Sequence, residues 1–285
     1  MTHCDRINRA LEFIEANLDN EIHLDSLAKE SAFSKYHFHR IFRALIGDPP
    51  FKYIEKRRIS KAAHDLLHSE KRIVDIAFDY GFNSHESFIR AFRKSFHQTP
   101  SHFRKTRPTV EFHAKCQLGA LELMLKAGAV RLNPRIWHQP SFLLAGLAYS
   151  GRDSKAIYGL WEKFWQAASK AGKKVETAAC YGACFHDIDM RNREVFDYYV
   201  GIKVNQLTEV PKGMKTVRLP ENTYALFTHR GPISEIELTY DRIYGNWLPL
   251  TNYTPTMDLD IIVVDHRFSV QGTDSEVDIL IPIQG

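Results

Sequence analysis

The chain has 285 residues, of which 44% are hydrophobic and 25% charged, and these values predict two globular domains, each with its own core. The longest apolar stretches are far shorter than the roughly 20 residues of a membrane-spanning helix, and the charged N-terminal stretch has no apolar signal region. Four cysteines do not form a disulfide framework at this length, so we expect a cytoplasmic protein with reduced thiols and no membrane partner.

Charge is distributed unevenly along the chain. Residues 1–108 contain 19 Lys and Arg against 14 Asp and Glu, a net charge of +5. The remaining residues contain 19 against 20, a net charge of −1. A basic first part followed by a nearly neutral second part predicts an anionic partner for the first part only.

Residues 1–108 show the apolar spacing of helices throughout, and part of the pattern occurs twice. After Ser34, an expected N-cap, Phe38, Ile41 and Phe42 fall on one face of a helix. The outer face of that helix is basic. The sequence repeats after 50 residues, so that Ser34, Phe38, Arg40, Phe42, Arg43 and Pro50 correspond to Ser84, Phe88, Arg90, Phe92, Arg93 and Pro100.

A long amphipathic helix is predicted over residues 51–67, between the two copies. In each copy a short helix, a tight turn and a second helix with one apolar and one basic face follow the helix-turn-helix pattern. Two such units on one rigid connector can enter successive major grooves about 34 Å apart. The alternative is a helical bundle with solvated charges, but the outer arginines recur together with the core positions, which favours DNA binding.

The second copy, "DIAFDYGFNSHESFIRAFRKSFHQTPSHFR", resembles the signature of the AraC-family DNA-binding domain. The resemblance implies an all-α domain over residues 1–108, with two helix-turn-helix units joined by a long helix. It also implies that bases are read from the outer N-terminal half of each second helix. Arginines there can bind guanine bidentately, while basic residues further along more often hold phosphates. The implied base readers are Tyr36, His39, Arg40, His85, Glu86, Ser87 and Arg90, and the implied phosphate contacts are Arg43, Arg93 and Lys94.

After a linker at residues 109–132, residues 133–285 change to strand patterns with two intervening helices. A strand, a helix and two strands follow one another twice, which predicts a duplicated β-α-β-β unit in an α+β domain. The helices would cover one face of an antiparallel sheet. The domain is also rich in aromatic side chains, a feature typical of ligand-binding clefts. We expect such a cleft to draw on Trp161, Trp165, Tyr181, Tyr199, Tyr224 and Trp247.

This second part resembles the GyrI-like effector-binding domain in the strand "FLLAGLAYSG", the tryptophan-bearing helices and the closing "SEVDILIPI". The resemblance implies a pocket between the two halves that binds a small-molecule effector. It further implies a buried pocket acid that meets lipophilic cations. Asp260 aligns with that acid, and a shift of the alignment makes Glu276 the alternative. A carboxylate among aromatic rings favours a cation in either case.

Together these features predict a sequence-specific, effector-responsive transcriptional regulator that binds double-stranded promoter DNA. A contact with RNA polymerase is left open. We expect no enzyme activity, no catalytic residue, no cofactor and no metal, since the sequence contains no phosphate-binding loop, dinucleotide fingerprint or set of metal ligands. Two alternatives remain: a ligand-sequestering or hydrolytic GyrI-like module tethered to a DNA reader, and a purely architectural DNA binder.

Overall fold

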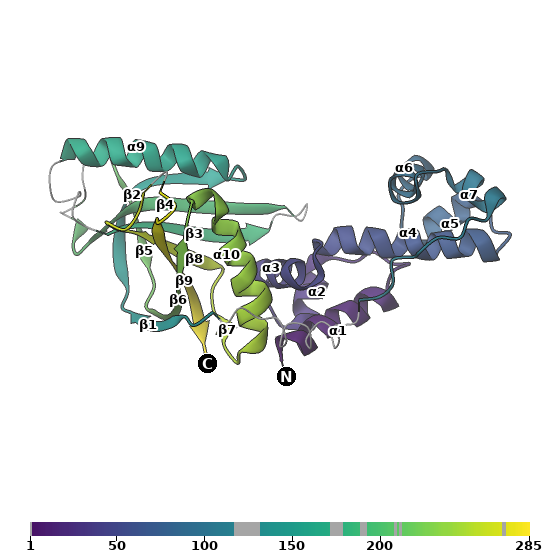
Figure 1. The fold of residues 1–285 in the computed structure, drawn as a ribbon, viewed down its shortest axis with the longest axis horizontal. Coiled ribbons are helices and arrows are strands. Elements are labelled where there is room, and N and C mark those ends of the chain that lie inside the picture. Colours follow the sequence, from purple (N-terminus) through teal and green to yellow (C-terminus); the bar gives the residue numbers. More distant parts are fainter. Residues whose placement is uncertain are drawn as a thin grey trace. The chain divides into compact units, whose positions relative to one another are not determined.

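The computed structural model of the chain describes residues 2–116, 132–171, 179–188, 193–207, 210, 213–269 and 272–285. It contains two compact units, a helical one at residues 1–128 and one built on a β-sheet at residues 129–285 (Figure 1). Most of the predicted linker lies outside the described residues. Among those residues, no helix combines the length and the apolar character that crossing a bilayer requires.

The helical unit consists of short helices arranged around one long helix, α4, with α3 and α6 near its opposite ends (Figure 1). At 19 residues, α4 is about 28 Å long. The helices are α1 (His3–Ala16), α2 (Leu24–Ser31), α3 (Lys35–Ile46), α4 (Pro50–His68), α5 (Ile73–Asp79), α6 (His85–Phe96) and α7 (Pro100–Thr106).

The repeat of 50 residues is visible in the ends of the helices. Helices α3 and α6 each have 12 residues, and each begins after a serine whose hydroxyl accepts a backbone N–H of the first turn. Ser34 Oγ accepts from His37 N at 3.2 Å, and Ser84 Oγ accepts from Ser87 N at 3.1 Å. The predicted N-cap at Ser34 is therefore confirmed, and α6 has the same cap.

The second helix-turn-helix unit packs around aromatic rings. Phe88, Phe92 and Phe103 are completely buried, together with small residues of α4 and α5. The rings of Phe92 and Phe103 meet edge to face, with their centroids 5.2 Å apart. This core holds α6 against α5 and α7, and the opposite face of α6 is left to solvent.

Charged side chains tie α4 to α1 and to the segment that follows α7. Arg57 donates to both carboxylate oxygens of Glu15, at 2.6 and 2.8 Å, and also to the His113 carbonyl. The backbone N–H of Cys116 donates to Tyr53 Oη at 3.3 Å. The first eight residues of the predicted linker therefore lie along α4.

The second unit contains an antiparallel sheet whose described strands follow the order β1-β6-β9-β8-β3-β4-β2-β5, with β7 beside β9. Helices α9 and α10 occupy the two long connections, β2 to β3 and β6 to β8. The elements are β1 (Arg135–Gln139), β2 (Phe142–Gly151), α9 (Lys155–Ala171), β3 (Cys180–Ile188), β4 (Glu194–Val204), β5 (Lys215–Leu219), β6 (Asn222–Arg230), α10 (Ile236–Arg242), β7 (Thr254–Pro255), β8 (Leu259–Val264) and β9 (Glu276–Gln284).

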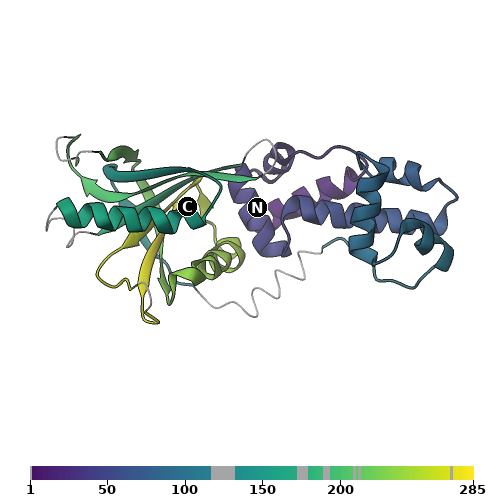
Figure 2. The same cartoon turned by 90° about the horizontal axis from the view of Figure 1, so that it is seen from above.

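The two faces of the sheet carry different cores. Helix α9 lies along one face, where Phe164 packs with Cys180, Cys184 and Val200 (Figure 2). The other face gathers side chains of β2, β3, β5, β6, β8 and β9 into a single cluster.

Candidate functional site

The outer face of α6 is open to solvent over the residues expected to read bases. His85, Glu86 and Arg90 are exposed and Ser87 is half-buried, while Phe88 between them is buried. The Ser84 cap fixes the start of the helix and leaves its first turn at the surface. Arg90 lies one turn further along the helix and is exposed as well.

The matching face of α3 differs from the sequence-based expectation. Tyr36 has 1% of its surface exposed and Arg40 has 9%, whereas the spacing predicted that both face outward. One reason lies within the helix, since the two side chains contact each other. Arg40 Nε donates to Tyr36 Oη at 3.2 Å, and the guanidinium lies 5.6 Å from the ring centre. His39 is half-buried.

The basic residues in the second halves of both helices are at the surface. Arg43, Arg93 and Lys94 are all exposed. They lie in the last turns of α3 and α6, where positive charge also interacts favourably with the helix dipole. Exposed charges of this kind position a protein on a phosphate backbone without reading sequence.

In the sheet unit, the buried carboxylate of Asp260 lies at the centre of a polar cluster on the face covered by the helices. Its exposure is 3%. Tyr240 Oη, from α10, donates to Oδ1 at 2.7 Å, and His186 Nε2, from β3, lies 2.5 Å from Oδ2. The other imidazole nitrogen of His186 lies 3.7 Å from Cys184 Sγ.

A second polar pair lies beside this cluster. Cys184 is paired across β3 with Tyr198 on one side and with Asp260 on the other, so their side chains share one face of the sheet. Trp161 Nε1, from α9, donates to Tyr198 Oη at 3.0 Å. Burial raises the pKa of Tyr198. A Cβ on Gly182 would lie 2.0 Å from Tyr198 Oη, so only glycine leaves room for this phenol.

The structure does not bring all the predicted aromatic residues to Asp260. Tyr224 belongs to the core on the opposite face of the sheet, and Tyr181 and Tyr199 pack against it. The reason is the alternation of side chains along a strand, since Tyr199 directly follows Tyr198 and must point the other way. Burial raises the pKa of Tyr224 to about 12.

The remaining two predicted aromatic residues are on the helix-covered side. Trp165 packs against Trp161 on α9, with centroids 5.8 Å apart. Trp247, which follows α10, meets Phe227 edge to face at 5.0 Å and stacks on Tyr253 at 5.9 Å. Of the six predicted aromatic residues, Trp161, Trp165 and Trp247 therefore share the face on which Asp260 lies.

Glu276 occupies a different environment from Asp260. Its carboxylate pairs with Arg230 at 3.0 Å and with Arg267 at 3.2 Å. Arg267 also holds Asp265 and Asp278, and its hydrogen bonds lower the pKa of Asp265. Glu276 is thus part of a half-exposed ion-pair network, and of the two alternative acids only Asp260 is buried.

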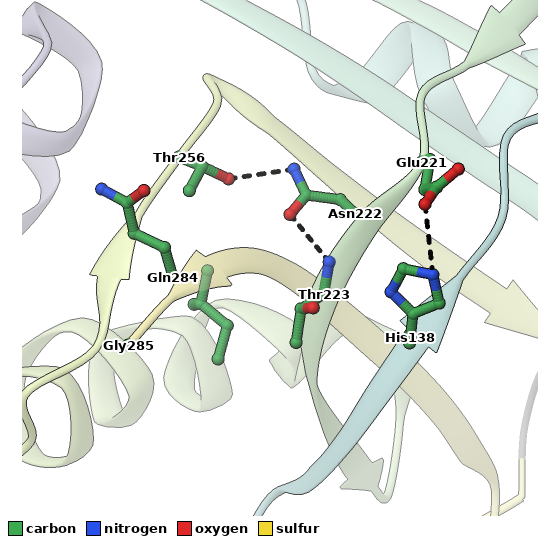
Figure 3. Close-up of a pocket in the computed structure, with 8 residues that line it drawn as sticks. His138, Glu221, Asn222, Thr223, Thr256, Gln284 and Gly285 are labelled. Carbon is green, nitrogen blue, oxygen red and sulfur yellow. Dashed lines mark hydrogen bonds and ion pairs between the residues drawn. The ribbon is translucent and has the colours of Figure 1, made fainter.

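A hollow of about 450 Å³ opens at the edge of the sheet, away from the Asp260 cluster (Figure 3). His138 faces Glu221 at 3.4 Å, and Asn222 donates to Thr256 at 3.0 Å. None of the predicted effector-binding residues lines this hollow. Its lining residues are His138, Glu221, Asn222, Thr223, Thr256, Ile283, Gln284 and Gly285.

Sequence reasoning overlooked His186 and Cys184 as members of a site, and it counted Tyr198 and Tyr240 only toward the aromatic content of the domain. The spacing of Cys184 and His186 was an available signal, because residues two apart on a strand share a face. Tyr240 and Asp260 gave no such signal, since the contacts of Asp260 come from residues 20 and 74 positions away.

Two family profiles and several known proteins match the chain. A "GyrI-like small molecule binding domain" matches residues 132–284, and a "Helix-turn-helix domain" matches residues 27–106. The right origin-binding protein of Escherichia coli is 28% identical over 262 residues, which cover 90% of this chain and 88% of that protein. The transcriptional regulator YbfP of Bacillus subtilis is 40% identical over 98 residues, covering 34% of this chain and 33% of that protein.

Among solved structures, that of SAV2435 bound to tetraphenylphosphonium shares 14% sequence identity, with a TM-score of 0.43 over 54% of this chain and 95% of that one. The family assignment rests on the sequence profiles, since the GyrI-like profile alone spans more than half of the chain. The chain belongs to the GyrI-like family and joins its small-molecule-binding domain to a helix-turn-helix domain of the AraC type, the composition of a DNA-binding transcriptional regulator with an effector domain.

Proposed function

We propose that the helical unit reads promoter DNA with α3 and α6, and that α6 supplies the larger part of the sequence discrimination. The exposure of the N-terminal half of α6 supports this proposal. In it, Arg90 is the principal base reader. Glu86 and His85 lie at its first turn and can meet neighbouring base edges. Arg43, Arg93 and Lys94 would hold phosphates and set the position of the unit on the duplex.

In α3, we assign a smaller role in base reading to Tyr36, His39 and Arg40. Arg40 is already engaged by Tyr36, so a contact with guanine costs it that hydrogen bond and the contact with the ring. DNA binding through both helices would use two adjacent major grooves, since α4 is about as long as the spacing between them.

We further propose that the effector of the second unit binds against Asp260 and that it is a lipophilic cation. The single observation that carries this proposal is a carboxylate with 3% exposure that accepts from Tyr240 Oη, on the face of the sheet where Trp161 donates to Tyr198. Aromatic rings around such a charge favour a large apolar cation.

The family matches support a regulator rather than an enzyme, and we propose that ligand binding is the function of the second unit. We also regard this unit as a duplicated β-α-β-β arrangement, from the succession β2-α9-β3-β4 and β6-α10-β8-β9. An effector then controls transcription only if it binds two states of the protein with different affinities. Altered promoter occupancy and altered contact with RNA polymerase are the two available outputs.

Two measurements test the proposal. Sequencing of DNA fragments selected by the full-length protein should yield a two-part recognition site, whereas enrichment of no sequence would leave only an architectural role. A thermal-shift series with tetraphenylphosphonium should raise the melting temperature of the wild-type protein. Asp260→Asn should remove most of that shift, and Glu276→Gln, in the ion-pair network, should retain it. Equal shifts in both variants would exclude Asp260 from the site.

A further inference from the structure

The polar cluster around Asp260 contains a thiol, and its order is that of an activated nucleophile. Asp260, His186 and Cys184 follow one another in a chain of contacts, at 2.5 Å between carboxylate and imidazole and 3.7 Å between imidazole and sulfur. We propose that Cys184 is a reactive thiol that captures electrophilic small molecules of the α,β-unsaturated carbonyl class.

The contacts of His186 fix which nitrogen can act as the base. A carboxylate accepts hydrogen bonds, so Nε2, which faces Asp260 Oδ2, carries the proton. Nδ1 faces Cys184 Sγ and is the nitrogen that would accept the thiol proton. Tyr240, which donates to the other oxygen of Asp260, holds the carboxylate in place. The arrangement of nucleophile, base and orienting acid is the one that activates cysteine in other proteins.

The fold holds these groups on rigid elements. Cys184 and His186 are two residues apart on β3, and Asp260 is the direct partner of Cys184 on β8. His186 is fixed further by its backbone N–H, which donates to the Asp258 carbonyl at 2.7 Å. The His186 side chain is 11% exposed and Cys184 is 6% exposed, so the cluster lies at the boundary of the buried region.

The proposed reaction needs no further reactant. The thiol proton moves to His186 Nδ1 as sulfur attacks the β-carbon of the ligand, forming the S–C bond. The C=C π bond breaks, and its electron pair moves toward the carbonyl as an enolate. The imidazolium then returns the proton to the α-carbon. Thiol and alkene are consumed, a thioether is formed, and nothing is oxidised or reduced.

This inference rests on the proposed function in one respect, that small molecules enter the second unit near Asp260. It concerns a different property, covalent reactivity, and it names a second class of ligand. The aromatic side chains of Trp161 and Phe164 beside the thiol suit ligands with an apolar body. Covalent capture would make the response to such a ligand lasting, in contrast to the reversible binding of a cation.

The test uses N-ethylmaleimide, an α,β-unsaturated imide, on the full-length protein at pH 7. Peptide mass spectrometry follows the labelling of each of the four cysteines with time. Cys184 should be labelled at least tenfold faster than Cys180, which lies on the same strand and face and whose pKa is raised to about 11 by burial. If both react at one rate, as expected of core cysteines that react only on unfolding, the inference is wrong.

Variants then identify the base. His186→Asn should slow the labelling of Cys184 at least tenfold at pH 7, and the difference should shrink toward pH 10, where thiols ionise without help. Asp260→Asn should slow it to a smaller extent, since it disturbs only the orientation of His186, and Cys180→Ala should leave it unchanged. An unchanged rate in His186→Asn would overturn the inference. A different result is that Cys184 is inert while tetraphenylphosphonium still raises the melting temperature in a way that depends on Asp260. That result would refute this inference and leave the proposed function intact.

Discussion

Replacing Arg90 by alanine should remove discrimination at one base pair of the operator and leave the stability of the fold unchanged. Arg90 is exposed on α6, outside the core of Phe88 and Phe92, so its loss creates no cavity and exposes no buried partner. A bidentate contact between arginine and guanine is worth about 1–3 kcal/mol, which corresponds to roughly a 5- to 150-fold loss of affinity for the preferred site.

The assay is a fluorescence-anisotropy titration of the selected operator and of its three single-base variants at the affected position, over a range of salt concentrations. The wild-type protein should distinguish the four sequences, and Arg90→Ala should bind them nearly equally. Lys94→Ala is the matched control, since an exposed phosphate contact in the same helix should weaken all four equally and reduce the salt slope by about 0.9. If Arg90→Ala behaves like this control, Arg90 contacts a phosphate and the assignment is wrong.

Three further predictions concern stability. Phe92→Ala should destabilise the helical unit by about 3–5 kcal/mol in urea denaturation, because it opens a cavity in a fully buried aromatic core. Arg57→Ala should lower the free energy of unfolding by about 2–3 kcal/mol, less than the ~3–5 kcal/mol expected when a fully buried ion pair is broken. In a double-mutant cycle, Arg57→Ala combined with Glu15→Ala should cost less than the sum of the two single losses. Arg267 lowers the pKa of Asp265 in the folded protein. The stabilisation from this pair is therefore present above the unfolded pKa of 3.8 and is lost as the pH falls through the lower folded pKa. The difference in melting temperature between the wild-type protein and Arg267→Gln, measured by calorimetry, should therefore be present at pH 7 and vanish in acid.

The helical unit could be predicted closely because its signals are local. The cap at Ser34, the apolar stripe of Phe38 and Phe42, and the correspondence of α3 with α6 all depend on residues within a few turns of one another. The exposure of Arg40 was predicted from the same helical geometry and was not found. One reason is a contact within the helix, because Arg40 Nε donates to Tyr36 Oη and periodicity does not predict contacts between neighbouring outer side chains.

The sheet unit was harder, although its element types were read correctly from alternation and helical spacing. An abundance of aromatic residues suggests a cleft, but on strands neighbouring residues point to opposite faces. Tyr198 and Tyr199 illustrate the consequence, since Tyr198 shares the face of Asp260 and Tyr199 packs against the core on the opposite face. Composition alone cannot separate the two.

The contacts of Asp260 depend on register, which explains why sequence reasoning missed its partners. Asp260 joins Cys184 only because β8 pairs with β3 in a single register, and a slip of one residue would move the carboxylate to the opposite face of the sheet. The pairing of Cys184 with His186 was readable within β3 itself. The cysteine of a Cys-x-His pair becomes a candidate nucleophile only once the residue on the neighbouring strand is known. In this protein the neighbouring strand β8 supplies the acid, Asp260.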